Sequence, residues 1–284
     1  SQRVYGTVRE NQLGHGPCYL QTSGITSEQD RDLLKAYLNM APSQTLKWIE
    51  NGKMPSEQDV EIQGTEPYIV GGHTASGFWV DTKRETTIHG LYAAGDVAGG
   101  CPQKYVTGAL AEGKIASFAI IEQLKSDSDE TTSTIEKQAQ VILKDYEKIR
   151  STQNGLFTID DLEEAMQKVM DEYAGGIASN YQFNEKQLKL AEEKIARLSE
   201  LAEQIGAEDM HELLFAYELK ERLLVCQVLI EHLKNRKETR WHSFNENLDH
   251  PETDEKFEKY VNSRMEDGKI RILFRDLVKG DTYE

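Results

Sequence analysis

The chain has 284 residues and a formal net charge of −16, so it is long enough for one large domain or for two to three smaller ones. This acidity disfavours a phosphate-binding surface and therefore a nucleic-acid partner. The N-terminus shows neither a signal-peptide pattern nor an initiator Met, and no apolar run approaches the roughly 18 residues of a membrane span. We expect a processed or excised piece of a longer protein without a transmembrane segment.

The three cysteines, Cys18, Cys101 and Cys226, lie far apart and form no CxxC pair. Such spacing excludes an iron–sulfur cluster or structural zinc held by this chain alone, and it indicates no metal site. Unpaired cysteines are typical of a reducing compartment, which predicts a cytoplasmic protein.

Residues 1–63 combine a strand signal with two helix signals. Residues 17–20 are expected to form a short strand. Ser27 is a suitable N-cap, and the acidic residues after it predict a helix over residues 27–39. A second short helix is predicted around residues 44–50.

Residues 64–125 are the richest in glycine. Short apolar runs predict strands at residues 68–70, 78–80 and 91–94. A helix with apolar residues at a period of 3.6 is predicted from about Val106 to Leu124.

The remaining chain is predicted to be mainly helical. Residues 126–134 are polar and low in complexity, which indicates a linker. Residues 135–236 contain four amphipathic segments and predict a helical bundle, with helices at 135–150, 159–173, 184–204 and 210–235. Residues 237–284 form a tail in which the Asp267–Gly268 pair, between two strand-like runs, predicts a β-hairpin.

One unit of this pattern can perform chemistry. The third predicted strand ends at Gly95–Asp96, where a glycine lets the backbone approach a ligand and a carboxylate can accept hydrogen bonds from ribityl or ribose hydroxyls. Gly99 and Gly100 follow in the loop. The next helix starts at Val106–Thr107–Gly108, and its positive end suits a group that becomes anionic on reduction. We interpret residues 87–96 as half of a flavin site.

The pattern Thr-x-x-x-Gly-Leu-Tyr-Ala-Ala-Gly-Asp-x-x-Gly-Gly resembles the second FAD-binding motif of the succinate dehydrogenase/fumarate reductase flavoprotein superfamily. Residues 164–175 resemble a helix of its C-terminal helical domain, so the resemblance covers most of the chain from about His15 onward. It implies FAD as the cofactor. It also implies an α+β fold: an incomplete FAD-binding α/β portion with a remnant of the capping domain, then a C-terminal helical bundle and a short β-hairpin tail.

The resemblance implies a division into domains with the boundaries of the segments above. Residues 1–63 would be the end of the capping (substrate) domain, and residues 64–125 the C-terminal part of the FAD-binding domain. The linker at 126–134, the bundle at 135–236 and the tail at 237–284 would follow.

One branch of the superfamily fits best. Residues 66–73, 76–80 and 95–102 are similar to the adenylylsulfate reductase α subunit. That similarity implies electron transfer between flavin and a small anionic substrate, with a separate iron–sulfur subunit as partner. Succinate and fumarate enzymes carry a longer loop with an Arg that clamps a dicarboxylate, whereas this loop has only Lys104 nearby, and lysine is not an equivalent clamp.

Further roles follow from the resemblance alone. His73 would lie by the flavin and substrate and act in catalysis, and Lys104 would face the substrate anion. Arg240 is a second substrate candidate, for which a surface or domain-docking role is equally open. Trp79 is expected to pack near the flavin ring, and Cys101 is expected to be a packing residue.

The chain lacks the Gly-x-Gly-x-x-Gly motif that binds the pyrophosphate of FAD in this superfamily. We therefore expect the chain alone to bind FAD weakly or not at all and to be inactive. Two alternatives stay open: a flavoprotein of the fumarate reductase, succinate dehydrogenase or aspartate oxidase type, and, for the isolated chain, a non-catalytic helical interaction module.

Overall fold

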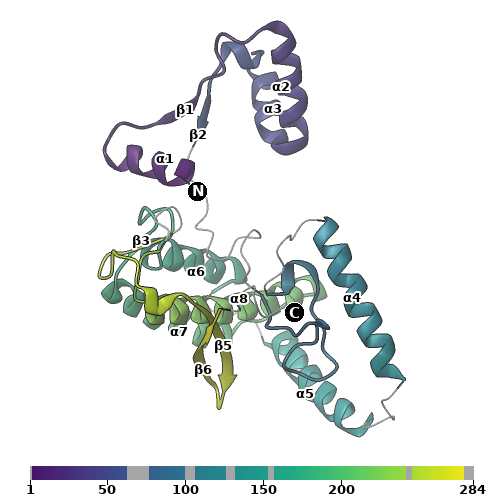
Figure 1. Cartoon of the computed structure of the whole chain (residues 1–284). Coiled ribbons are helices and arrows are strands. Elements are labelled where there is room, and N and C mark those ends of the chain that lie inside the picture. Colours follow the sequence, from purple (N-terminus) through teal and green to yellow (C-terminus); the bar gives the residue numbers. More distant parts are fainter. Residues whose placement is uncertain are drawn as a thin grey trace. The chain divides into compact units, whose positions relative to one another are not determined.

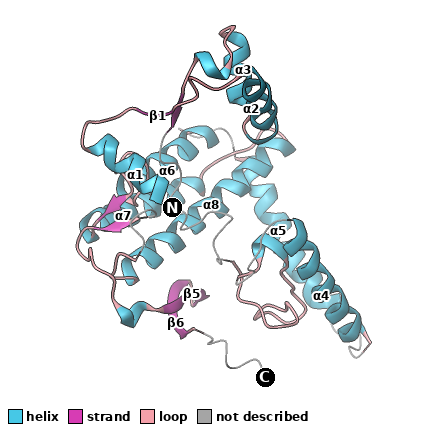
Figure 2. Ribbon diagram, turned by 45° about the horizontal axis from the view of Figure 1, so that its top comes forward, coloured by secondary structure: helices cyan, strands magenta, loops and turns pink. Residues whose placement is uncertain are grey.

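Helices dominate the structure, a computed structural model that describes residues 2–62, 77–99, 106–125, 132–152, 157–240 and 245–277. These residues contain eight α-helices and three two-stranded sheets (Figures 1 and 2). The predicted α+β class with a helical bundle and a hairpin tail is confirmed. Within the described residues, no helix has the length and apolar character needed to cross a membrane.

The chain divides into two compact units, residues 1–65 and 66–284. The finer boundaries expected from the sequence stay predictions. The predicted strand at 68–70 and the first part of the predicted linker, residues 126–131, lie outside the described residues. The end of that segment is helical, because a helix begins at Thr132.

The first unit joins a small sheet to a helical hairpin. Its elements are α1 (Gln2–Gln12), β1 (Cys18–Leu20), α2 (Ser27–Met40), α3 (Pro42–Glu50), η1 (Pro55–Glu57) and β2 (Val60–Ile62). Strand β1 confirms the predicted strand and pairs antiparallel with β2. The cap of α2 differs from the expectation: Thr26, not Ser27, is the N-cap and forms a capping box with Gln29. Helix α3 begins earlier than predicted because Pro42 suits the first position of a helix.

Trp48 is the centre of this unit and is fully buried. Its ring meets the Tyr37 ring edge-on at 5.2 Å, and its indole N–H donates to the Gln58 carbonyl at 3.1 Å. Asp30 is also buried and accepts hydrogen bonds from the backbone N–H and the hydroxyl of Ser56, at 2.7 and 2.6 Å. These contacts fasten α2 and α3 to the η1 turn.

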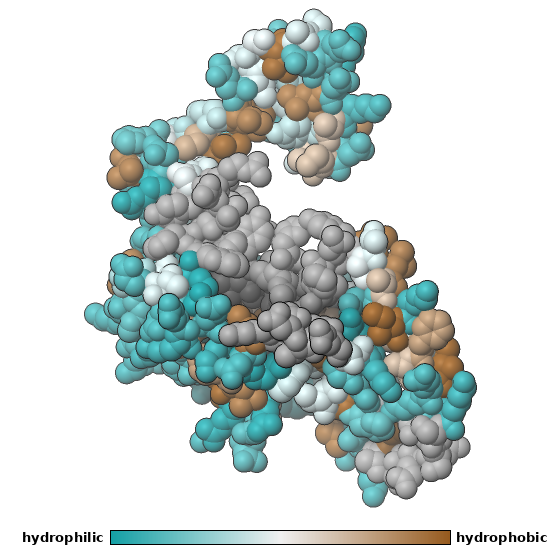
Figure 3. Space-filling view, in the orientation of Figure 1, coloured by the Kyte–Doolittle hydropathy of each residue, from teal (hydrophilic) through white to brown (hydrophobic). Residues whose placement is uncertain are grey.

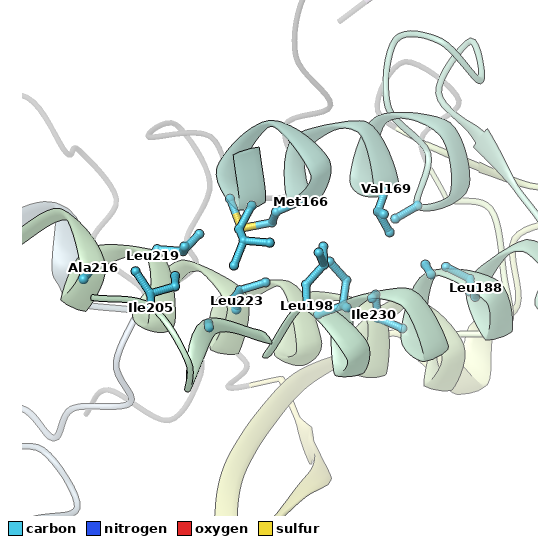
Figure 4. Packing of buried hydrophobic residues seen from close by; sticks show 14 of the residues in the cluster. Met166, Val169, Leu188, Leu198, Ile205, Ala216, Leu219, Leu223 and Ile230 are labelled. Atoms are coloured by element: carbon cyan, nitrogen blue, oxygen red, sulfur yellow. The ribbon is translucent and has the colours of Figure 1, made fainter. Parts of the chain in front are cut away.

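The four predicted helices of the bundle are confirmed as α5 (Thr132–Ser151), α6 (Ile159–Tyr173), α7 (Glu185–Ala202) and α8 (Met210–Asn235). The last three begin at side-chain caps, namely Thr158, Asn184 and Asp209. Helices α6, α7 and α8 pack on one another, and the C-terminal turns of α5 complete the core. Figure 4 shows Met166, Leu198 and Leu223, one from each of these three helices, within this core.

The predicted hairpin is confirmed as β5 (Lys259–Glu266) and β6 (Lys269–Asp276). Asp267 and Gly268 both have positive φ, 50° and 71°, as the favoured two-residue hairpin turn requires. The hairpin packs on α8, where His232 Nε2 lies 3.0 Å from Ser263 Oγ. Burial, with help from the Arg236 charge, lowers the pKa of His232, and the Glu231 charge opposes this shift.

The chain between α8 and the hairpin is anchored to the bundle. Strand β4 (Glu246–Asn247) pairs parallel with β3 (Gln182–Phe183), and η3 (Glu255–Phe257) precedes the hairpin. The Thr239 side chain is buried; it donates to the His250 carbonyl at 2.9 Å and accepts from the Asn247 backbone N–H at 2.9 Å.

Candidate functional site

The turn at Gly95–Asp96 starts a 3₁₀ segment, η2 (Gly95–Val97), rather than ending a strand. The predicted strand at residues 91–94 is wrong, because only an isolated bridge joins Tyr92 to Glu85. Gly95 is buried and has φ +76°, and a Cβ there would lie 3.3 Å from Ala109 Cβ. The positive φ favours glycine here, and the following helix leaves little room for a larger side chain.

A second close backbone contact holds the loop after Asp96. The Phe78 N–H donates to the Val97 carbonyl at 2.7 Å, and the Gly99 N–H donates to the Phe78 carbonyl at 2.8 Å. Gly77 has φ +154°, and a Cβ there would lie 2.6 Å from backbone atoms of Val97, Ala98 and Gly99. The predicted strand at 78–80 is thus replaced by two isolated bridges, at Phe78 and at Val80.

A buried ion pair joins this loop to helix α4 (Val106–Leu124). The guanidinium of Arg84 binds the Glu112 carboxylate at two points, Nε to Oε2 and Nη2 to Oε1, the latter at 2.9 Å. The two side chains are 22% and 8% exposed. Arg84 also donates to the Asp81 and Thr82 carbonyls, both at 3.2 Å, and its φ is +72°. Because the pair is bidentate and largely desolvated, it fixes the loop on the helix.

A polar network joins the loop to the other end of α4. The Tyr92 hydroxyl donates to Gln123 Oε1, and Gln123 Nε2 lies 2.9 Å from His89 Nε2. His89 Nδ1 lies 3.0 Å from Glu85 Oε1, which also accepts from the Gly90 N–H at 2.8 Å. The loop is therefore bound along most of the length of α4.

The structure brings together most of the described residues predicted for the cofactor. Gly95 and Asp96 lie in η2, which contacts α4, and Gly99 follows directly. The predicted start of α4 is confirmed, so residues 106–108 form its first turn. The Asp96 side chain is exposed. An exposed carboxylate close to the N-terminal turns of a helix offers both an acceptor for hydroxyls and a dipole for an anion.

The exposed side of α4 is apolar. Glu112, Ala116 and Ala119 form the buried side, whereas a second stripe of large apolar residues faces outward: Val106, Leu110, Phe118, Ile121 and Leu124 are 75%, 70%, 60%, 51% and 72% exposed. Figure 3 shows apolar side chains gathered along this helix. An apolar surface of this kind is typical of a place where further protein binds.

Other predicted site residues lie elsewhere. His73, Gly100, Cys101 and Lys104 are outside the described residues. Arg240 lies in the tail, where its guanidinium donates twice to the Glu238 carboxylate, at 3.0 and 2.9 Å, and once to the Asp254 carbonyl at 3.1 Å.

Glu238 is the centre of that tail cluster. Its side chain is fully buried and also accepts from Arg236 at 2.8 Å. Burial opposes ionisation, but the hydrogen bonds from Arg240, from the Asp254 N–H and from Arg236 outweigh it and lower the pKa of Glu238. The cluster gives Arg240 a structural function in the tail; its predicted role toward a substrate stays a prediction.

Sequence reasoning missed the Arg84–Glu112 pair, and it also missed a second contact between residues that are distant in sequence. The Arg275 guanidinium, on β6, lies 3.6 Å from the centroid of the Trp79 ring and 5.2 Å from that of Tyr260. Trp79 therefore packs on the hairpin. No local pattern in the sequence indicates this stack.

Residues 163–282 match the family model described as "Fumarate reductase flavoprotein C-term". The chain is 28% identical to adenylylsulfate reductase subunit alpha of Megalodesulfovibrio gigas, covering 94% of this chain and 47% of that protein. It is 25% identical to an uncharacterized FAD-dependent oxidoreductase of Methanocaldococcus jannaschii, covering 90% of this chain and 44% of that protein.

Two solved structures are also similar to this chain. Adenylylsulfate reductase from Archaeoglobus fulgidus has a TM-score of 0.84 and 29% identity, covering 100% of this chain and 51% of that one. The E. coli quinol fumarate reductase FrdA structure has a TM-score of 0.79 at 19% identity, covering 96% of this chain and 47% of that one, which shows a shared fold. The chain spans about half the length of the relatives it matches. These similarities support a relationship of the chain to the succinate dehydrogenase/fumarate reductase flavoprotein superfamily.

Proposed function

We propose that this chain is the C-terminal part of an adenylylsulfate reductase-like flavoprotein subunit and supplies half of its FAD site. The observation that carries the proposal is the Gly95–Asp96 turn, seated against the first turns of α4 through the contact of Gly95 with Ala109. The adenylylsulfate branch is supported by 28% and 29% identity to two such enzymes over 94% and 100% of the chain.

The turn at Gly95–Asp96 and the start of α4 support a site for the ribityl and ring part of FAD. Asp96 would accept hydrogen bonds from hydroxyls, and the N–H groups of Val106, Thr107 and Gly108 would face the ring edge that gains negative charge. The glycines at 99 and 100 would let the backbone approach. Bound FAD would supply two-electron chemistry, while this chain would bind the cofactor, orient it and stabilise its reduced form.

The substrate we propose is a small anion. Lys104 would attract it as a point charge, and His73 would donate a hydrogen bond or a proton beside the flavin. Arg240 is the weaker substrate candidate, because its guanidinium already donates to Glu238 and Asp254. A relative with 27% identity is described as an adenosine-5-phosphosulfate reductase in complex with sulfite as a covalent adduct, which is consistent with this chemical class.

Two partners complete the proposed enzyme. The pyrophosphate part of the FAD site must come from outside this chain, because no Gly-x-Gly-x-x-Gly motif occurs here. The exposed apolar stripe of α4 suits contact with that part. Electrons would pass to a separate iron–sulfur subunit, and the net charge of −16 would favour a basic partner surface.

The alternative is a fumarate reductase, succinate dehydrogenase or aspartate oxidase relative. Its supporting observation is the family match at residues 163–282. The loop after Asp96 argues against it, because Lys104 is the sole cation of residues 97–105 and the dicarboxylate-clamping arginine is missing.

The full-length flavoprotein that contains this chain tests the proposal. We expect reduction of adenylylsulfate to AMP and sulfite with a reduced dye as donor, and no comparable turnover of fumarate. Lys104→Met should raise the KM for adenylylsulfate roughly tenfold, since one charge-assisted contact is lost. Lys114→Met, on α4, is the matched control and should leave KM unchanged. Turnover of fumarate without turnover of adenylylsulfate would contradict the proposal and favour the fumarate reductase type.

A second set of variants tests His73. His73→Asn should lower kcat roughly 100-fold if the imidazole transfers a proton in catalysis. His250→Asn, in the tail, is the control. An unchanged kcat in His73→Asn would remove this residue from the proposed mechanism.

A further inference from the structure

Arg275 contacts two aromatic rings that belong to different parts of the second unit. Its guanidinium carbon lies 3.6 Å from the Trp79 ring centroid and 5.2 Å from the Tyr260 ring centroid. Its Nε donates to Asn262 Oδ1 at 2.7 Å. Asn262 and Tyr260 are on β5, so the hairpin itself holds the guanidinium while Trp79 packs on it.

Trp79 is adjacent to the backbone contact that shapes the proposed flavin turn. Its neighbour Phe78 donates to the Val97 carbonyl and accepts from the Gly99 N–H, at 2.7 and 2.8 Å. Val97 is the last residue of η2, which begins at Gly95. Phe78 is therefore the single residue that links Trp79 to the η2 turn, and a displacement of Trp79 would reach the turn through Phe78.

We propose that Arg275 is a positioning residue through which the C-terminal hairpin holds the Gly95–Val97 turn in the conformation that binds flavin. This inference rests on the proposed function for the identity of the ligand. It assigns the hairpin a function in cofactor binding. Arginine suits this position because its planar guanidinium stacks on a ring while its edge keeps a hydrogen bond, which a lysine ammonium cannot reproduce.

The contacts run without a break from α8 through the hairpin to the η2 turn. Arg275 is half-buried, and the Trp79 side chain is 43% exposed although it stacks on a cation. The hairpin is in turn fixed on α8 by the contact of His232 with Ser263. The contact of the hairpin with α8, the stacked cation and the short backbone bridge thus form one continuous physical path to η2.

The first test measures the stack without any flavin. Emission of Trp79 is isolated by subtracting the spectrum of a Trp79→Phe variant, and its quenching by acrylamide is compared between proteins. Arg275→Met should raise the quenching constant on the order of twofold, because one ring face loses its cover. Arg271→Met is the matched control: this arginine is on the same strand and pairs with Glu266 at 3.7 Å. Equal quenching in both variants would overturn the stack.

The second test measures coupling to the cofactor in the full-length flavoprotein. Arg275→Met should weaken FAD binding roughly tenfold and change the visible circular dichroism of bound flavin, with unchanged far-ultraviolet circular dichroism. Arg275→Lys should recover only part of the loss. The double variant with Trp79→Leu should lose little more than either single variant, because both substitutions break one interaction.

The outcomes separate this inference from the proposed function. If the wild-type full-length protein binds no FAD, the proposed function fails, and the inference fails with it even if the Trp79 stack is found. If wild type binds FAD but Arg275→Met behaves as Arg271→Met, the proposed function stands and the positioning role is overturned. Additive losses in the double variant would also overturn it.

Discussion

Removing Arg84 should release the loop at residues 77–99 from helix α4. Arg84→Met leaves the Glu112 carboxylate, whose side chain is 8% exposed, without its bidentate partner. Removing one partner of a buried ion pair costs roughly 3 to 5 kcal/mol. We use about 3 kcal/mol, the lower end of this range, because Arg84 is 22% exposed. The opening equilibrium of the loop should then rise by about 100-fold.

Native-state hydrogen exchange measures this opening. The N–H groups of Ala93 and Gly99, which bond to the Arg84 and Phe78 carbonyls, should exchange about 100-fold faster in Arg84→Met. Lys83→Met is the control, because its pairing with Glu122 at 3.8 Å joins two exposed side chains and contributes less than about 1 kcal/mol. The double variant Arg84→Met/Glu112→Met should regain most of the protection. Equal exchange in the two single variants would refute the reasoning.

Three further predictions concern stability. The folded-state pKa of His232 is lowered, so the stability that His232 contributes is present above its unfolded pKa of about 6.5 and is lost as pH falls. Hydrogen exchange in the hairpin should therefore accelerate below that pH in wild type but not in His232→Asn. The folded-state pKa of Glu238 is also lowered, so the stability that Glu238 contributes is present above its unfolded pKa of about 4.3 and is lost on acidification. Glu238→Gln should abolish that pH dependence and destabilise the tail by roughly 3 kcal/mol, as measured by limited proteolysis. Leu188→Ala, at a side chain 1% exposed, should lower the bundle's unfolding free energy in urea by about 3 kcal/mol, whereas Leu190→Ala, 38% exposed on the same helix, should cost less than about 1 kcal/mol.

The helices and the hairpin were predictable because their signals are local. Asp267–Gly268 determines a turn by itself, and the 3.6-residue period of α6 and α7 identifies their buried faces before any partner is known. Even the misplaced helix starts obey local rules, since Thr26 as an N-cap and Pro42 as a first helical residue are favourable one or two positions from the expected starts.

The structure of residues 91–94 was not predictable in the same way, and the strand expected there is not formed. A short apolar run becomes a strand only where a neighbouring strand supplies hydrogen bonds, and here Tyr92 finds a single bridge partner in Glu85. The Ala93 N–H instead bonds to Arg84 at 3.0 Å. Backbone hydrogen bonds across a loop depend on the fold of the whole chain and leave no periodic pattern in the sequence.

Only the local features of the candidate site were predictable from the sequence. A glycine at position 95 was expected for close approach, and the structure shows that one approaching group is Ala109 of α4. The Arg84–Glu112 pair and the Arg275–Trp79 stack each join residues distant in sequence, so neither has a local pattern. The only hint of the ion pair was an acidic residue, Glu112, on the face of α4 that also carries Ala116 and Ala119.

The central claim is that this chain holds one half of a flavin site, and a flavin titration tests it most directly. FAD binding is measured by visible absorption for the isolated chain, for the full-length protein and for its Asp96→Ala variant. The account predicts near-stoichiometric FAD in the full-length protein, roughly tenfold weaker binding in Asp96→Ala, and little or no FAD on the isolated chain. Near-stoichiometric flavin on the isolated chain, or unchanged affinity in Asp96→Ala, would contradict it.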